Sequence, residues 1–265
     1  MKIFEWLAEM RYRNALLYQI GMIHAIVAVI LLIGIIVDPR EVMGINPWIK
    51  PTKFFLSTTA LVFTMGWFMF DLRLTRPRWI KVISWTYVIG LLIENIIITL
   101  QASRGVRSHF NYSTAMDGAL FGAMGLFIGI ITLATTVLFV LFLIHRGGNP
   151  IHNFAVRISL LLHLVGSWIG GVMISRGGHA VGIVDGGEGI PFLNWSTLGG
   201  DLRIGHFLGL HAIQAIPLFS YWIRTKFSFA PTTQFILTAL FSAIYAGLIS
   251  WCYMNAMNGV PLLAS

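Results

Sequence analysis

Four ionisable residues lie within long apolar stretches of the sequence: His24, Glu94, His163 and His211. Ionisable side chains inside a bilayer are costly and are therefore candidates for a functional site. At about 1.5 Å of helix rise per residue, the three histidines lie near the bilayer midplane, whereas Glu94 lies in the outer third. Histidines from facing helices can hold a haem or another metal at that depth. The sequence therefore predicts a cofactor between the helices that carry these histidines.

The neighbours of His163 favour a flat ligand beside it. Gly166, Ser167 and Gly170 lie within about 60° of His163 on an ideal helix, which leaves a smooth stripe next to the imidazole. A porphyrin needs such a stripe, and so does a closely packed helix. We predict that haem b is bound at this level, and the alternative is that each histidine only hydrogen-bonds across the bundle. The predicted cofactor-binding histidines are His24, His163 and His211, the last two as metal ligands.

A polar stripe continues outward from Glu94. Glu94, Gln101 and Arg104 lie on one broad face if the helix extends that far, and Arg104 and Arg107 then precede His109. Two arginines at the mouth of an intramembrane pocket are typical of an anion site, for haem propionates, a lipid phosphate or a carboxylate substrate. The alternative is ordinary pairing with lipid head groups or with nearby aspartates.

A second polar group opens the sixth apolar stretch. Arg203, His206 and Gln214 share a helix face within about 80°, whereas His206 and His211 point about 140° apart and should not ligate one metal ion together. His206 therefore belongs with the outer groups. The predicted catalytic residues are Glu94, His109, Asp117 and His206, and the arginines predicted to bind the cofactor or an anion are Arg104, Arg107 and Arg203.

Three functions account for these residues. The first is a membrane oxidoreductase or electron-transfer protein that holds haem b and exchanges electrons with a quinone, and it is preferred because it explains three histidines at similar depth. The second is a hydrolase or lipid-modifying enzyme with zinc or another divalent metal at the outer face. Its ligands would come from His109, His179, His206, Asp117, Asp185 and Asp201. The third is a transporter or receptor for a small anion, with Glu94 as a proton-linked carboxylate.

The composition indicates that the bilayer is the solvent for most of the chain. Of the 265 residues, 57% are hydrophobic and only 11% are charged, whereas about a quarter are charged in a soluble domain. The net charge of +8 does not indicate a nucleic-acid partner, because the basic residues are spread over short loops and form no single patch. A single cysteine, Cys252, excludes a disulfide within the chain.

Seven apolar stretches are long enough to cross a bilayer, so we predict an all-α bundle of seven transmembrane helices. Residues 1–13 read as a short interfacial amphipathic helix, and residues 14–265 as one transmembrane domain with a Gly-rich outer loop at 175–202 that resembles a lid or a binding loop. Glycines spaced along the fourth stretch predict a close helix contact. The predicted spans are 15–37, 53–71, 79–100, 116–144, 152–174, 203–223 and 230–254.

The distribution of Lys and Arg predicts the orientation. The N-terminal segment and the even-numbered loops carry 11 of these residues and the odd-numbered loops carry 7. This excess places the N-terminus in the cytoplasm and the C-terminus outside, in a bacterial cytoplasmic membrane. The architecture resembles that of the seven-helix hydrolases of the ceramidase and adiponectin-receptor class, but their paired histidines in the last span are missing. The last span also has no lysine, which excludes a retinal photoreceptor.

Overall fold

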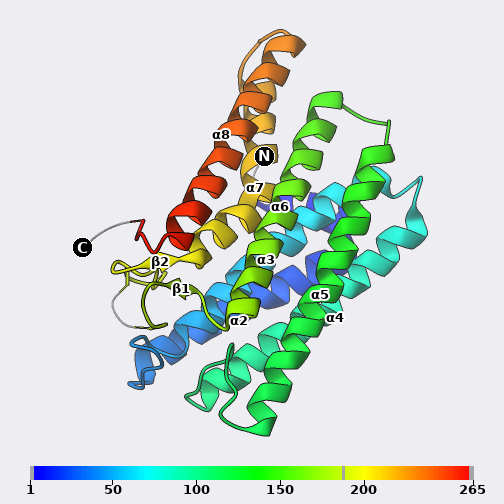
Figure 1. Cartoon of the computed structure of the whole chain (residues 1–265). Helices are drawn as coiled ribbons and strands as arrows, with labels where there is room; N and C mark the ends of the chain where they lie inside the picture. The colour runs from blue at the N-terminus through cyan, green and yellow to red at the C-terminus, as the bar shows by residue number, and fades with distance from the viewer. Residues whose placement is uncertain (1–2, 187–188, 263–265) are drawn as a thin grey trace. The chain divides into compact units, whose positions relative to one another are not determined.

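The computed structural model describes residues 3–186 and 189–262, and this part of the chain is almost entirely helical (Figure 1). One short antiparallel pair of strands joins Ala180 to Asp201 in the loop between the sixth and seventh helices. The elements in chain order are α1 (Ile3–Arg13), α2 (Ala15–Val37), α3 (Ile49–Met69), the 3₁₀ turn η1 (Phe70–Leu72), α4 (Pro77–Ser103), α5 (Ala115–Ile144), α6 (Pro150–Arg176), β1 (Ala180–Val181), β2 (Gly200–Asp201), α7 (Leu202–Lys226) and α8 (Pro231–Met257).

Six helices are long and apolar enough to cross a membrane: α2, α3 together with η1, α4, α5, α6 and α8. The chain is therefore an integral membrane protein built of helices. Helix α7 is also long, at 25 residues, but it falls outside these six, because polar residues such as His206, His211 and Gln214 interrupt its apolar sequence. The seventh span and the orientation stay predictions.

The helix bounds lie close to the predicted ones, with one difference that matters for the site. Helix α3 begins at Ile49 rather than at residue 53. Pro51 lies in the first turn, where a proline costs nothing because its missing N–H would have had no partner in the helix. Lys50 and Lys53 are therefore helical residues, and their side chains lie at fixed positions on one end of α3.

Residue contacts divide the chain into two compact units, Met1–Ala134 and Thr135–Ser265. Unit 1 contains α1 to α4 and the first part of α5, and unit 2 contains the rest of α5 and helices α6 to α8. The single transmembrane domain over residues 14–265 stays a prediction.

In unit 1, helix α5 presents a different face to α4 than the glycine spacing predicts. No neighbouring atom in the described chain lies within 4 Å of a Cβ built at Gly122, Gly125 or Gly129. A Cβ at Gly90 of α4 would instead lie 2.7 Å from the Ile131 side chain of α5. Within the described residues of unit 1, α5 therefore packs beside α4 with its larger side chains and not with these glycines, and the predicted close contact of the glycine face with another helix stays a prediction.

In unit 2, helices α6 and α7 touch backbone to backbone. A Cβ built at Gly166 would lie 2.6 Å from the backbone nitrogen of Leu210, and one at Gly209 would lie 2.5 Å from the Cα of Gly166. Small residues allow helices to approach closely in a membrane, where dispersion contacts replace the hydrophobic effect. The smooth stripe beside His163 therefore seats a neighbouring helix, which is one of its two predicted uses.

We expect Gly166→Ala to destabilise unit 2 by about 1–3 kcal/mol, because the added methyl group meets rigid backbone rather than a flexible side chain. The matched control is Gly171→Ala in the same helix, where a Cβ meets nothing within 4 Å, so that only the better helix propensity of alanine acts. Thermal unfolding in detergent micelles measures both. Equal midpoints for the two variants would contradict the backbone contact.

Candidate functional site

A buried carboxylate in α4 lies next to a histidine and a lysine. Glu94 is 3% exposed, and its Oε1 lies 3.5 Å from Nε2 of His109. The other ring nitrogen of His109, Nδ1, lies 3.2 Å from Nζ of Lys50 and 3.1 Å from Oγ of Ser108. Two of the predicted catalytic residues, Glu94 and His109, therefore lie together, and Lys50 completes a row of three ionisable groups.

The chemistry of Lys50 determines which nitrogen of His109 carries the proton. An ammonium group can only donate hydrogen bonds, so Nδ1 of His109 accepts and Nε2 carries the hydrogen that faces Glu94. A proton can then pass along the row. When Lys50 gives a proton to Nδ1, Nε2 can release its own proton to the Glu94 carboxylate. After this transfer Lys50 is neutral, His109 is neutral with its hydrogen on Nδ1, and Glu94 is protonated.

Aromatic rings enclose this row and limit its contact with water. The ring of His109 lies 5.9 Å from Phe54, 6.2 Å from Phe110 and 5.9 Å from Phe121, centroid to centroid. The side chain of His109 is 26% exposed, whereas that of Glu94 is 4% exposed. The row therefore runs from a partly open histidine to a carboxylate in a dry environment, where charge is costly.

Glu94 has an unused oxygen in this environment. Within the described residues, no hydrogen-bond partner reaches its buried Oε2 or the buried Oδ1 of the adjacent Asn95. The amide nitrogen of Asn95 is used, since it donates to Oγ1 of Thr58 at 3.0 Å. Buried polar atoms in native proteins nearly always have partners, so exceptions indicate a place where a proton, water or ligand binds.

A second network holds the loop that carries His109. Asp117 accepts hydrogen bonds from Gln101 at 2.8 Å, from Arg104 at 2.6 Å and from Thr114 at 2.7 Å. Thr114 in turn accepts from the backbone N–H of Asp117, a capping pattern that fixes the start of α5. Arg104 thus joins the end of α4 to the start of α5. Arg104 and Asp117 position the loop and do not face the Glu94 oxygen.

His24 is the histidine of unit 1 that the sequence predicts near the midplane. Its Nδ1 lies 2.8 Å from the carbonyl oxygen of Ile20, and its ring lies 5.0 Å from that of Phe55 at a tilt of 37°. A carbonyl can only accept, so Nδ1 carries the hydrogen and Nε2 presents a lone pair. Within the described part of the chain, that buried Nε2 has no hydrogen-bond partner.

The histidines of unit 2 cross the contact between α6 and α7 in both directions. His163 of α6 donates from Nδ1 to the carbonyl of Leu210 at 2.9 Å, and His206 of α7 donates from Nδ1 to the carbonyl of Gly166 at 2.7 Å. The Nδ1 of His211 lies 3.2 Å from Oε1 of Gln214. The bonds of His163 and His206 are therefore of the kind named as the alternative to a cofactor, whereas His211 bonds within its own helix.

A haem does not fit between α6 and α7 at this level. The backbones at Gly166 and Gly209 are in contact, and a porphyrin between His163 and His211 would have to separate them. The predicted iron ligation by these two histidines therefore finds no space between their own helices. A haem held by His24 stays a prediction.

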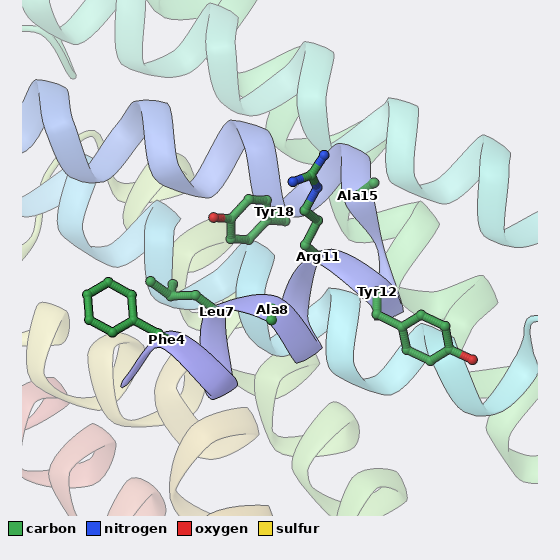
Figure 2. Close-up of a pocket in the computed structure, with 7 residues that line it drawn as sticks. All are labelled: Phe4, Leu7, Ala8, Arg11, Tyr12, Ala15 and Tyr18. Carbon is green, nitrogen blue, oxygen red and sulfur yellow. The ribbon is translucent and has the colours of Figure 1, made fainter. Parts of the chain in front are cut away.

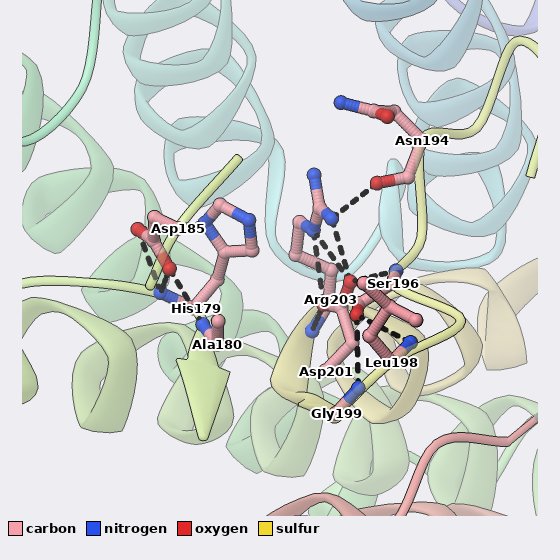
Figure 3. A network of polar contacts seen from close by, with 9 residues as sticks. All are labelled: His179, Ala180, Asp185, Asn194, Ser196, Leu198, Gly199, Asp201 and Arg203. Atoms are coloured by element: carbon pink, nitrogen blue, oxygen red, sulfur yellow. Dashed lines mark hydrogen bonds and ion pairs between the residues drawn. The ribbon is translucent and has the colours of Figure 1, made fainter. Parts of the chain in front are cut away.

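The loop between α6 and α7 is held by two acidic residues (Figure 3). Asp185 accepts from the backbone N–H of His179 and Ala180 and lies 3.1 Å from the His179 ring. Asp201 accepts from Arg203 at 2.6 Å and from the backbone of Ser196 at 2.9 Å. The pocket beside them has a volume of about 10 Å³, which is room for one water molecule. These contacts fix the backbone of the loop.

The guanidinium of Arg203 donates to Asp201 and to the carbonyl of Asn194, so it is not free to bind an anion. Burial alone would raise the pKa of Asp201. The pKa is nevertheless below its ordinary value, because Asp201 accepts hydrogen bonds from Arg203 and from the backbone N–H of Ser196 and lies next to the positive charge of Arg203. The guanidinium of Arg203 joins the start of α7 to the loop.

The predicted zinc ligands do not form a ligand set. In residues 3–186 and 189–262, no group of three or more His, Cys, Asp or Glu side chains is placed to hold a metal ion.

The chain matches no protein-family model, no curated protein and no solved structure. Function must therefore be argued from the geometry of the two units. Of the predicted catalytic residues, Glu94, His109 and Asp117 lie in unit 1 and His206 lies in unit 2.

Sequence reasoning missed Lys50 and Asn95 as site residues. Lys50 lies three residues before the apolar stretch that we predict as the second span, and Asn95 is a neutral polar residue next to Glu94. A signal for Lys50 was present, because the proline at position 51 is typical of the first turn of a helix. That signal places the helix start before residue 53.

We expect Asp201→Asn to lower the stability of unit 2 by about 1–2 kcal/mol, because it removes a buried charge that Arg203 binds. A carboxyl group with a depressed pKa contributes stability above its ordinary pKa of about 3.9 and loses it as the pH falls below that value. The difference in thermal midpoint between the wild type and the variant should therefore be largest near neutral pH and vanish in acid. A difference that is constant with pH would contradict the assignment.

Proposed function

We propose that this protein is a proton-linked membrane transporter of a small anion, in which Glu94 takes up and releases the proton. The observation that carries the proposal is the row of Lys50, His109 and Glu94, which leads from a partly exposed imidazole to a carboxylate in a dry environment. Acidic and histidine side chains inside membrane proteins typically serve as proton relays.

The charges at this end of unit 1 favour an anionic ligand. Fixed positive charges outnumber carboxylates here, and an anion gains from that excess wherever water is scarce. The cations are Arg40, Lys50, Lys53, Arg104 and Arg107, and the carboxylates are Asp38, Glu41, Glu94 and Asp117. Arg40 is bound to Asp38 and Arg104 to Asp117, so the excess of one positive charge comes from the two lysines and Arg107 against Glu41 and Glu94.

The same geometry couples the anion to the proton. Lys50 and His109 compensate the charge of Glu94 in the resting site. An anion that binds Lys50 and His109 competes with the carboxylate for that compensation, so Glu94 becomes stable only in its protonated form. By thermodynamic linkage, a proton on Glu94 must strengthen anion binding by the same factor. The charge of the bound anion replaces the charge that Glu94 loses on protonation, so the anion and the proton bind together.

The test is proton-driven uptake into proteoliposomes, with a panel of acetate, lactate, succinate and phosphate and a pH-sensitive dye inside. We expect at least one anion to carry protons with it. Glu94→Gln should abolish the proton movement and retain exchange of the anion between the two sides, because a neutral amide imitates the protonated acid. Glu41→Gln makes the same chemical change at an exposed position and should behave as the wild type.

Failure of every anion in the panel to move protons, with folded protein in the membrane, contradicts the transport proposal. Proton movement that survives in Glu94→Gln contradicts the role of Glu94 and leaves transport standing. The two outcomes separate the function from its proposed residue.

A second candidate is a haem b electron-transfer protein, and the observation that favours it is His24. Its Nδ1 donates to a backbone carbonyl and its buried Nε2 offers a lone pair, which is the arrangement that second-shell hydrogen bonds give to metal-binding histidines. His24 would hold the iron of a haem bound there, and the haem would supply one-electron chemistry towards a quinone.

Absorption spectroscopy decides this candidate. Protein purified from cells supplied with haemin should show a Soret band, and His24→Ala should remove most of it. His152→Ala, at a partly exposed position near the start of α6, is the matched control and should leave the band unchanged. A folded wild-type protein without a Soret band excludes the candidate.

The proposed location rests on the distribution of charge and not on the transport activity. We place the protein in a bacterial cytoplasmic membrane with the N-terminus in the cytoplasm, supported by the excess of Lys and Arg in the N-terminal segment and the even-numbered loops. Helix α7 then serves as the seventh crossing and puts the C-terminus outside.

A further inference from the structure

A groove lies at the corner between α1 and α2, and neither the proton row nor the helix contacts use it. It has a volume of about 670 Å³. Phe4, Leu7 and Ala8 of α1 form an apolar wall, and Arg11 brings a guanidinium to its edge (Figure 2). Tyr18 of α2 contributes a phenol on the same side of the corner. The groove is therefore apolar along most of its wall and positively charged at one end.

The groove has a fixed shape because α1 is docked on unit 1 by its other face. The indole of Trp6 packs edge-on against Phe63 of α3 at 5.4 Å. Met10 is 1% exposed, and Arg13 lies 3.8 Å over the ring of Trp67. Asn14 caps α2 and donates to Ser84 of α4 at 2.9 Å. The apolar residues of the outward face remain uncovered, and Phe4 is 80% exposed.

Arg11 differs from the other arginines at this end of unit 1. Arg13 is paired with Glu9 at 2.8 Å and stacked on Trp67. Arg73 is stacked on Phe70 at 3.7 Å and donates to the hydroxyl of Tyr12 at 3.0 Å. Among the described residues, Arg11 makes no ion pair and lines the groove. Its charge is therefore available to a ligand.

We propose that this groove binds one anionic phospholipid, with the phosphate on Arg11 and an acyl chain along Phe4, Leu7 and Ala8. The position of the groove argues for a lipid. Helix α2 begins at Ala15 as a candidate membrane span, so the groove lies at the level where lipid head groups meet the hydrocarbon. An amphipathic helix at that level buries its apolar face among acyl chains. A guanidinium binds a phosphate with two parallel hydrogen bonds.

The sign of the charge selects the lipid class. By the orientation proposed above, this end of unit 1 faces the cytoplasmic leaflet, where anionic lipids attract juxtamembrane Lys and Arg. Arg11, Arg13, Arg73, Arg76 and Arg78 all lie at this end of unit 1. A zwitterionic lipid carries a compensating positive charge that these arginines repel. The groove therefore favours phosphatidylglycerol over phosphatidylcholine. This inference does not depend on the transport proposal.

The experiment is native mass spectrometry of the full chain released from nanodiscs of equal parts phosphatidylglycerol and phosphatidylcholine. We expect the wild type to retain one phosphatidylglycerol. Arg11→Gln should lower that retention about fivefold, which is the contribution of one juxtamembrane basic residue. Arg78→Gln removes a charge at the same end but outside the groove, and it should retain the lipid as the wild type does.

A second variant tests the groove without touching the charge. Ala8→Trp fills the apolar wall, and it should lower retention of the lipid while Arg11 stays in place. Equal retention in the wild type and Arg11→Gln would overturn the proposal, and so would equal losses in Arg11→Gln and Arg78→Gln. Competition by inorganic phosphate would show a site for free phosphate, and a co-purifying polypeptide in place of lipid would show a protein interface. Either result overturns the lipid assignment.

Discussion

A bilayer offers no water to a polar group, and every polar atom inside it must find its partner within the protein. This constraint explains most contacts in unit 1. Threonine hydroxyls such as those of Thr59 and Thr64 bond to carbonyls of their own helices, and Asn95 reaches Thr58. The exceptions are informative for the same reason. Among the described residues, Oε2 of Glu94 and Nε2 of His24 are buried without a hydrogen-bond partner, and burying an unpaired polar atom costs free energy.

The two units use their histidines differently. In unit 2, His163 and His206 each bond to a backbone carbonyl of the other helix across a glycine contact, so they hold α6 and α7 at a short distance. In unit 1, His109 bonds to two ionisable side chains, Lys50 and Glu94. A histidine that bonds to a carbonyl has a fixed tautomer, whereas one between a lysine and a carboxylate can change its tautomer and pass a proton. This difference is why the functional proposal rests on unit 1.

The aspartates of the loops fix geometry outside the helices. Asp38 accepts from Arg40 and from the indole of Trp48, and these hydrogen bonds hold the pKa of Asp38 well below its usual range. Asp201 joins the loop to α7 through Arg203. Asp117 joins the end of α4 to the start of α5. Loops held at both ends in this way keep His109 and the start of α7 in place.

The sequence by itself determined the membrane class and the helices, because apolar runs and proline positions act locally. It also named Glu94 and His109 as candidate site residues, since they belong to one stripe and the loop that follows it. Only the tertiary structure placed Lys50 beside His109 and turned His163 towards α7. Those contacts join residues 59 and 47 positions apart, so helical periodicity alone does not reveal them. For His163, the contact also depends on glycines of α6 and α7 that meet backbone to backbone.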